Sequence, residues 1–137
     1  MSLEPINPAS LAPPRGYSHG MLAPAGGRPL YVAGQVAWDG EQRIGSDDFA
    51  AQFAQALDNV LAVVAAAGGS PQDLAQMTIF VADKEAYAAA TPQLGAVWRQ
   101  RCGRHYPAIA LVEVAALLEP RALVEIQAIA VLPPQRG

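Results

Sequence analysis

Two glutamates within apolar segments are the first candidates for chemistry in this sequence. Glu113 lies in segment 108–114 and Glu125 lies in segment 123–131, and both segments have the aliphatic, β-branched composition of strands. Turn residues at 119–120 lie between them, so the two strands are expected to pair as a hairpin with Glu113 opposite Glu125. Two carboxylates on one half-buried face could share a proton and orient a water molecule for attack on a substrate.

The opposite faces of these two predicted strands are uniformly apolar. Side chains alternate between faces, so the even-numbered positions of both segments point away from the two glutamates. This apolar face would consist of Ala108, Ala110, Val112 and Val114 together with Val124, Ile126, Ala128 and Ala130. A slip of one residue would bury a carboxylate, so the register is well specified. A polar-lined cleft on one face and a core on the other are therefore predicted.

A few other side chains could take part in chemistry. Tyr17 could stack on a planar substrate, or it could anchor the N-terminal segment on the core. His19 and His105 each lack a second metal ligand or a catalytic partner nearby in the sequence, which favours structural roles. Cys102 lies among apolar positions at helical spacing and is expected to be inert core.

Composition and charge disfavour several classes of function. Hydrophobic residues make up 52% of the 137 residues and charged residues only 15%, which suggests that some surface is buried in an oligomer. The net charge of −3 and the scattered basic residues provide no footprint for nucleic acid. The single cysteine excludes an internal disulfide and a cysteine-pair metal site. No apolar stretch is expected to approach about 18 residues, so we expect a soluble, cytoplasmic protein with no membrane partner.

The elements that must position these residues follow the order β-β-α-β-α-β-β. Four prolines indicate that residues 1–16 form an extended lead. The first four predicted elements are strands at 18–22 and 30–36, a helix from a Ser46 cap to Gly68, and a strand at 74–81.

A second helical region from Asp83 to Gly103 precedes the final two strands, and Thr91 and Pro92 within it indicate an interruption and a restart. Both predicted helices are amphipathic. A single α+β domain spanning residues 1–137, with two helices on one face of a mixed sheet, is an economical arrangement for this order.

Short motifs along nearly the whole chain resemble the RidA family, also called YjgF or L-PSP. The motifs are Gly16-Tyr17-Ser18-His19-Gly20, Val32-Ala33-Gly34-Gln35, Thr78-Ile79-Phe80-Val81-Ala82-Asp83, Pro107-Ala108, Val112-Glu113-Val114 and Val124-Glu125-Ile126-Gln127-Ala128. Each motif alone is weakly specific, but their order and spacing together are specific. The resemblance implies a chorismate-mutase-like α+β fold of the bacillary type, assembled as a homotrimer with clefts between subunits.

The resemblance also implies an activity. Members of this family hydrolyse reactive enamines and imines to ketoacids and ammonia, without a metal or organic cofactor. By position, Glu125 matches the glutamate that helps to place the attacking water, and the backbone carbonyl of Leu111 matches a carbonyl that helps to hold it. Tyr17 matches the aromatic residue that walls the cleft. The small-molecule pocket would be shaped further by Ala33, Gly34, Thr91 and Ile109.

Three positions depart from the pattern of the family. Ile109 stands where an arginine that grips the substrate carboxylate is expected, Ala33 where a serine is common, and Thr91 where an asparagine is often found. A hydrogen bond to a charged group contributes roughly 1.5–3 kcal/mol, so loss of that arginine should weaken a carboxylate ligand by about one to two powers of ten. The expected substrate is therefore a neutral or apolar enamine or imine rather than one derived from an amino acid.

Several alternatives stay open on the sequence. Arg104, His105 or Arg121 could replace the missing arginine from a neighbouring loop or subunit. Without a replacement, the trimer could bind small molecules in the same clefts and catalyse nothing. Glu113 is more typical of an interface or solvent-facing carboxylate than of a catalytic one. RNA cleavage, an old label of the family, is disfavoured because the chain is acidic and has no basic stripe.

Overall fold

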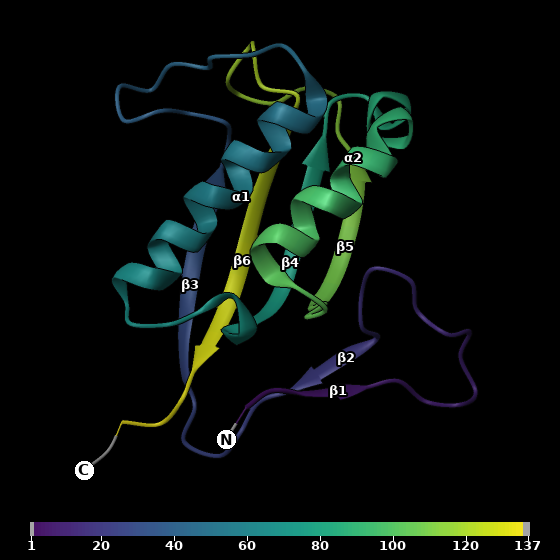
Figure 1. Cartoon of the computed structure of the whole chain (residues 1–137), viewed down its shortest axis with the longest axis vertical. Helices are drawn as coiled ribbons and strands as arrows, with labels where there is room; N and C mark the ends of the chain where they lie inside the picture. Colours follow the sequence, from purple (N-terminus) through teal and green to yellow (C-terminus); the bar gives the residue numbers. More distant parts are fainter. Residues whose placement is uncertain (1, 136–137) are drawn as a thin grey trace.

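The computed structural model describes residues 2–135, and two layers make up its body (Figure 1). A four-stranded mixed sheet has the order β3 (Arg28–Gln35), β6 (Val124–Leu132), β4 (Leu74–Val81) and β5 (Ala108–Glu113). β4 and β5 run parallel, whereas β6 runs antiparallel to both β3 and β4. Figure 1 shows both helices on one face of this sheet, which confirms the predicted α+β architecture.

The first helix, α1 (Phe49–Ala66), packs an apolar stripe on the sheet. Leu57, Val60 and Val64 recur at helical spacing and are fully buried in the core that α1 shares with the strands. The helix ends close to the predicted Gly68, which follows the C-cap and has a φ of +86° that favours glycine.

The start of α1 differs from the prediction. Its N-cap is Asp48, whose carboxylate accepts a hydrogen bond from the Ala51 N–H at 3.0 Å. The Ser46 hydroxyl accepts a hydrogen bond from the Asp48 N–H at 3.0 Å and so shapes the turn before the helix. Both side chains are good caps, and the one that directly precedes the apolar stripe takes the role.

α1 is also long and apolar enough to cross a membrane, with a mean hydropathy of 1.4 over its 18 residues. The expectation that no such stretch occurs is therefore wrong. This property is weak support for a membrane span, because a core helix passes the same test and the apolar stripe of α1 packs on the sheet.

The second helix, α2 (Lys84–Cys102), is continuous through Thr91 and Pro92, so the predicted interruption is wrong. Proline lacks an N–H and leaves the carbonyl four residues earlier, that of Ala88, without its helical donor. The Thr91 hydroxyl donates a hydrogen bond to this carbonyl at 2.9 Å. The threonine thereby satisfies the carbonyl that the proline leaves unpaired, and the helix continues.

The N-terminal segment forms a separate two-stranded ribbon, seen at the lower right of Figure 1. β1 (Glu4–Ile6) pairs antiparallel with β2 (Gly20–Leu22), and neither joins the main sheet. β2 confirms the C-terminal part of the strand predicted at 18–22. β1 was missed within the predicted extended lead, because Pro5 at its centre is tolerated only in a ribbon without neighbours on both sides.

The last two strands do not form a hairpin, because β4 lies between β5 and β6. A turn is present where it was predicted, and the Ala122 N–H donates to the Glu119 carbonyl at 3.0 Å. The whole connection, residues 114–123, is nevertheless long enough to pass over the end of β4. The apolar alternation of each strand was read correctly, but alternation contains no information on which strand is the neighbour.

The insertion of β4 also changes which side chains share a face. Val81 is paired with both Glu113 and Val124, whereas its neighbour Phe80 is paired with Val112 and Glu125. Successive residues of a strand point to opposite faces. Glu113 therefore lies on the helix-covered face and Glu125 on the open face, so the two carboxylates cannot form the predicted pair. The predicted apolar face of eight residues is likewise divided, with Ala108, Ala110 and Val112 on the open face and Val124, Ile126, Ala128 and Ala130 beneath the helices.

Candidate functional site

The predicted site residues fall into two groups on opposite faces of the sheet. Glu125, Ala33 and Gly34 lie at the open face, where no helix covers β3 and β6. Tyr17, Thr91, Ile109 and Leu111 line a pocket on the helix-covered side. No single cavity of one protomer, within residues 2–135, holds both groups.

The first group is built by an irregularity in β3. The pairing of β3 with β6 shifts register between Val32 and Gln35, so Ala33 and Gly34 stand in a bulge and are exposed. The half-buried Glu125 side chain passes directly over Gly34, and a Cβ added to Gly34 would lie 2.9 Å from the Glu125 carboxyl carbon. Glycine is therefore required at this close approach. Within the described residues, the Glu125 carboxylate has no hydrogen-bond partner.

The second group lines a pocket of about 450 Å³ between α2, β5 and the loop that precedes β2. This volume is within the range of small-molecule sites. Most of the wall is aromatic or aliphatic, and the Trp98 and Tyr106 rings stack with centroids 6.1 Å apart. Ile109 and Leu111 contribute the β5 wall, Thr91 and Trp98 the α2 wall. A planar apolar group fits such a pocket best.

Tyr17 is held in the pocket wall by the residues that follow it. Ser18 donates two hydrogen bonds to the segment before β5, from its N–H to the Pro107 carbonyl at 3.0 Å and from its hydroxyl to the Tyr106 carbonyl at 2.6 Å. His19 contacts Tyr17 edge to face, with ring centroids 5.3 Å apart, and its Nε2 bonds to the Ala12 carbonyl at 2.8 Å. Tyr17 thus both lines the pocket and lies in an anchored loop, and His19 has the structural role that was favoured.

The backbone carbonyl of Leu111 points to the free edge of the sheet. The Val114 N–H donates to the Val81 carbonyl at 2.9 Å, so the even-numbered residues of this segment direct their backbone groups toward β4. Backbone groups of successive residues alternate in direction along a strand. The carbonyls of Ile109 and Leu111 therefore face away from β4, at an edge that no described strand covers. Leu111 offers the available acceptor that its predicted role requires.

Glu113 has a structural contact outside both groups. Its carboxylate accepts a hydrogen bond from the Lys84 N–H at 2.9 Å, at the first turn of α2. The Asp83 carboxylate caps the same end by accepting from the Glu85 N–H at 2.9 Å. Negative groups are favoured at this end of a helix, so Glu113 stabilises α2 and does not act with Glu125.

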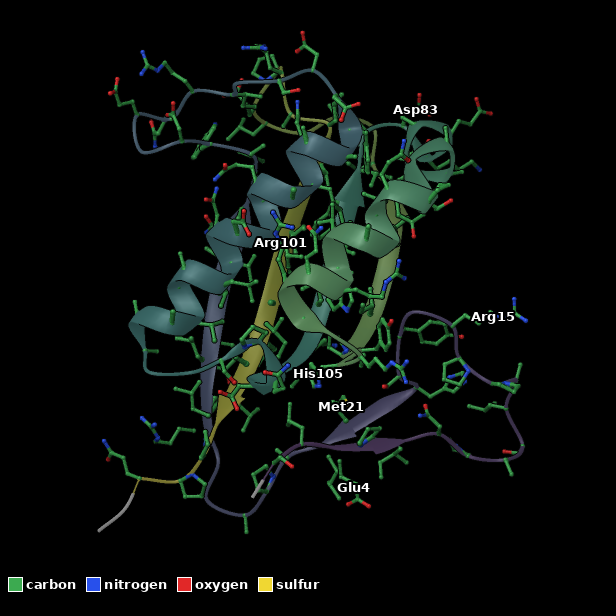
Figure 2. The ribbon with its side chains drawn as sticks, in the orientation of Figure 1. Glu4, Arg15, Met21, Asp83, Arg101 and His105 are labelled. Atoms are coloured by element: carbon green, nitrogen blue, oxygen red, sulfur yellow. The ribbon has the colours of Figure 1, made fainter. Side chains whose placement is uncertain are left out.

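None of the three residues considered as replacements for an arginine at position 109 lines the pocket. His105, labelled in Figure 2, bonds through Nε2 to the Leu74 carbonyl at 2.7 Å. Arg121 donates to the Ile44 carbonyl at 2.7 Å and to Asp47 at 2.9 Å. Arg104 is exposed beyond the end of α2.

Sequence reasoning missed several of the residues that build the pocket. Trp98, Tyr106 and Tyr87 line the pocket, and none of them was considered as a site residue. Arg15, two residues before Tyr17, also lines the pocket, and this short spacing was the signal that could have identified it. Within residues 2–135, no group of three His, Cys, Asp or Glu side chains is placed to hold a metal ion.

Comparison with known proteins identifies relatives along most of the chain. Residues 8–132 match the model of the family described as Endoribonuclease L-PSP. The 2-iminobutanoate/2-iminopropanoate deaminase of Salmonella typhimurium is 35% identical over 106 residues, which cover 77% of this chain and 80% of that protein. The deaminase of the same description from Escherichia coli K12 is 36% identical over 106 residues, with the same coverage.

Solved structures give the same result. The Rid family protein YyfB from Yersinia pestis superposes with a TM-score of 0.83 at 35% identity, over 96% of this chain and all of that chain. The YjgF protein of E. coli superposes with a TM-score of 0.68 at 33% identity, over 91% of this chain and 92% of that chain. With a mixed sheet, two helices on one face and a family match over residues 8–132, this chain belongs to the RidA/YjgF/L-PSP family.

Proposed function

We propose that this protein hydrolyses a small, reactive enamine or imine to a carbonyl compound and ammonia. It would act as a cytoplasmic homotrimer, without a cofactor and without a nucleic acid or membrane partner. Relatives at about 35% identity are imine deaminases, which supports the reaction class. The observation that carries the proposal is the division of the site, with the Glu125 carboxylate on one face of the sheet and the aromatic pocket on the other.

A second copy of the chain would complete the divided site. The open face of the sheet exposes large apolar side chains, with Tyr31 75% and Val112 41% exposed. Large apolar side chains that stay exposed on a sheet face favour association. If another protomer covers this face, Glu125 of one subunit can meet the pocket of its neighbour. Such a cleft would lie between subunits, where the family resemblance leads us to expect it.

The chemistry in such a cleft follows from two groups, the Glu125 carboxylate and the Leu111 backbone carbonyl. Water, held between the Glu125 carboxylate and the Leu111 carbonyl, attacks the imine carbon while Glu125 accepts one of its protons. The proton passes to the substrate nitrogen, and the resulting carbinolamine collapses to the carbonyl compound and ammonia. Water supplies the oxygen and two hydrogens, so no oxidant or reductant is needed. An enamine enters the same sequence after tautomerising to the imine.

Pocket shape would select the substrate. Tyr17 forms the wall against which a planar imine stacks, and Thr91 contributes a hydroxyl that already donates to Ala88. Ile109 supplies an apolar surface next to the reacting carbon, where desolvating a carboxylate would be costly. The preferred substrate therefore carries a neutral or apolar group at that position, while Ala33 would add a small side chain to the cleft and Gly34 leaves room for the Glu125 side chain.

Ammonia release from freshly generated imines tests the proposal. A neutral imine and an α-carboxylate imine of equal size are each compared with their uncatalysed decay, and the neutral imine is expected to be accelerated more. Glu125→Gln should lower kcat by about 10²- to 10⁴-fold, the range of general base catalysis. Glu113→Gln is the matched control, because glutamine can still accept the Lys84 N–H bond. Unaccelerated decay of both imines, or equal losses in the two variants, would contradict the proposal.

A second candidate is a trimer that binds small molecules in these clefts without turnover. Ile109 favours it, because the pocket wall on β5 has no charged group to orient a reacting carboxylate. Ligand-dependent thermal stabilisation without ammonia release would support this alternative. Sedimentation velocity on the purified chain measures the trimer independently of either activity, and a monomer at micromolar concentration would exclude both forms of the proposal.

A further inference from the structure

The only formal charge among the residues that line the aromatic pocket is positive. Of the residues that line it, Arg15 alone carries a formal charge, and no carboxylate of the described chain lines it. Arg15 lies on the loop that precedes β2, and Figure 2 shows its side chain extended outward from this loop. The cation is therefore at the outer margin of the pocket.

A second cation lies against the α2 side of the same margin. Arg99 follows Gly95 by one helical turn, and Gly95 lines the pocket. A Cβ added to Gly95 would be 3.3 Å from Nη1 of Arg99, so the guanidinium rests close to the Gly95 backbone. The absence of a side chain at Gly95 leaves the space that Arg99 occupies beside the pocket.

The guanidinium groups of Arg15 and Arg99 are unpaired in the described part of the chain, unlike those of most other arginines there. Within residues 2–135, neither Arg15 nor Arg99 makes a side-chain hydrogen bond or an ion pair. By contrast, Arg101 is bound to Asp58 through a contact of 2.6 Å. The arginines at positions 28, 43 and 121 are also bound to carboxylates or carbonyls. Arg104 is unpaired as well, but it has no contact with a pocket-lining glycine such as the one that places Arg99 beside Gly95.

We propose that the pocket selects ligands with a flat apolar body and an anionic group at the far end, held by Arg99 with Arg15 as a second donor. Guanidinium groups bind carboxylates in a bidentate manner, so Arg99 could hold a compact acid by itself, and Arg15 would add a second positive charge at the pocket. The apolar body would lie between Tyr17 and Trp98. The proposal deepens the proposed function, because the reacting carbon would stay beside Ile109 and the acid group would be distal to it.

Binding of two matched probes tests this inference without turnover. 3-Phenylpropanoate and its neutral amide, 3-phenylpropanamide, have the same body and length and differ in charge. We expect isothermal titration calorimetry to give the anion at least about tenfold higher affinity, as one charged hydrogen bond provides. Arg99→Gln should remove about tenfold of the affinity for the anion and leave the amide unchanged, and Arg15→Gln should have a smaller effect in the same direction.

Arg104→Gln is the control, because it removes one exposed positive charge near the same end of α2 without touching the pocket. Arg99→Lys should retain part of the preference, and circular dichroism confirms that each variant is folded. Equal affinities for the two probes, no binding of either, or an equal loss in Arg104→Gln would overturn the inference. Charge-selective binding without hydrolysis of any imine would support it and count only against the proposed catalysis.

Discussion

Gly34→Ala offers a sharp test of the site, because it alters the position of the Glu125 carboxylate without changing any polar group. The added Cβ would lie 2.9 Å from the carboxyl carbon and 3.1 Å from Cγ of Glu125, and closer still to Oε2. Carbon atoms at optimal contact are about 3.5–4.0 Å apart. The carboxylate must therefore retreat by between roughly half an ångström and one ångström.

A displacement of about 1 Å at a catalytic group can cost about 10²-fold in rate. We expect kcat for the neutral imine to fall by about that factor. Stability should change little, because Glu125 is half-buried and can turn toward solvent, and because φ of Gly34 is not in the left-handed region. The loss of chain entropy in the unfolded state on replacing glycine by alanine adds only about 0.4–1 kcal/mol in favour of folding.

The assay is steady-state ammonia release, with thermal unfolding measured on the same preparations. Gly45→Ala is the matched control, because a Cβ at Gly45 meets no atom within 4 Å and Gly45 has no positive φ. Its rate should equal that of the unaltered protein. Full activity in Gly34→Ala would refute the reasoning, since it would show that the observed position of Glu125 does not matter to the reaction.

Two further predictions concern the buried groups. Gln52 is 1% exposed, donates hydrogen bonds to the Ser46 and Arg121 carbonyls, and accepts one from the Leu123 N–H. Gln52→Leu should therefore lower the free energy of unfolding, measured by urea titration, by about 3 kcal/mol or more. A loss below about 1 kcal/mol would contradict this prediction. Burial raises the pKa of the Cys102 thiol to about 11, so this group stabilises the fold fully below about pH 9 and the contribution is lost as pH rises toward 11. Iodoacetamide should therefore leave Cys102 unmodified at pH 8 in the folded protein and modify it in urea, and rapid native labelling would disprove the assignment.

The sequence by itself determined the elements and their faces, because these depend on local pattern. The strand at Leu74–Val81 was predicted from its β-branched and aromatic content, and the apolar stripe of α1 was predicted from helical spacing. Short motifs around Gly34 and Glu125 also indicated the family, because the order of such motifs along the chain can be recognised without knowing any contact. The bulge that brings these two residues together lies at Gly34, and a glycine within a strand pattern is the local signal typical of a bulge.

The prediction failed where two local signals competed. Thr91 and Pro92 look like a helix restart, but the threonine hydroxyl satisfies Ala88 and the helix continues. Asp48 and Ser46 were both competent caps, and only the path of the chain selected one of them.

Only the tertiary structure decided the neighbours of each strand, and with them the organisation of the site. Placing β4 between β5 and β6 puts Glu113 under the helices and Glu125 on the open face, although each carboxylate alternates with apolar residues just as predicted. Side-chain alternation is fixed within a strand, whereas strand order follows from loop length and from burial of the whole sheet against α1 and α2. The division of the candidate site between two faces therefore could not be read from any one segment of the chain.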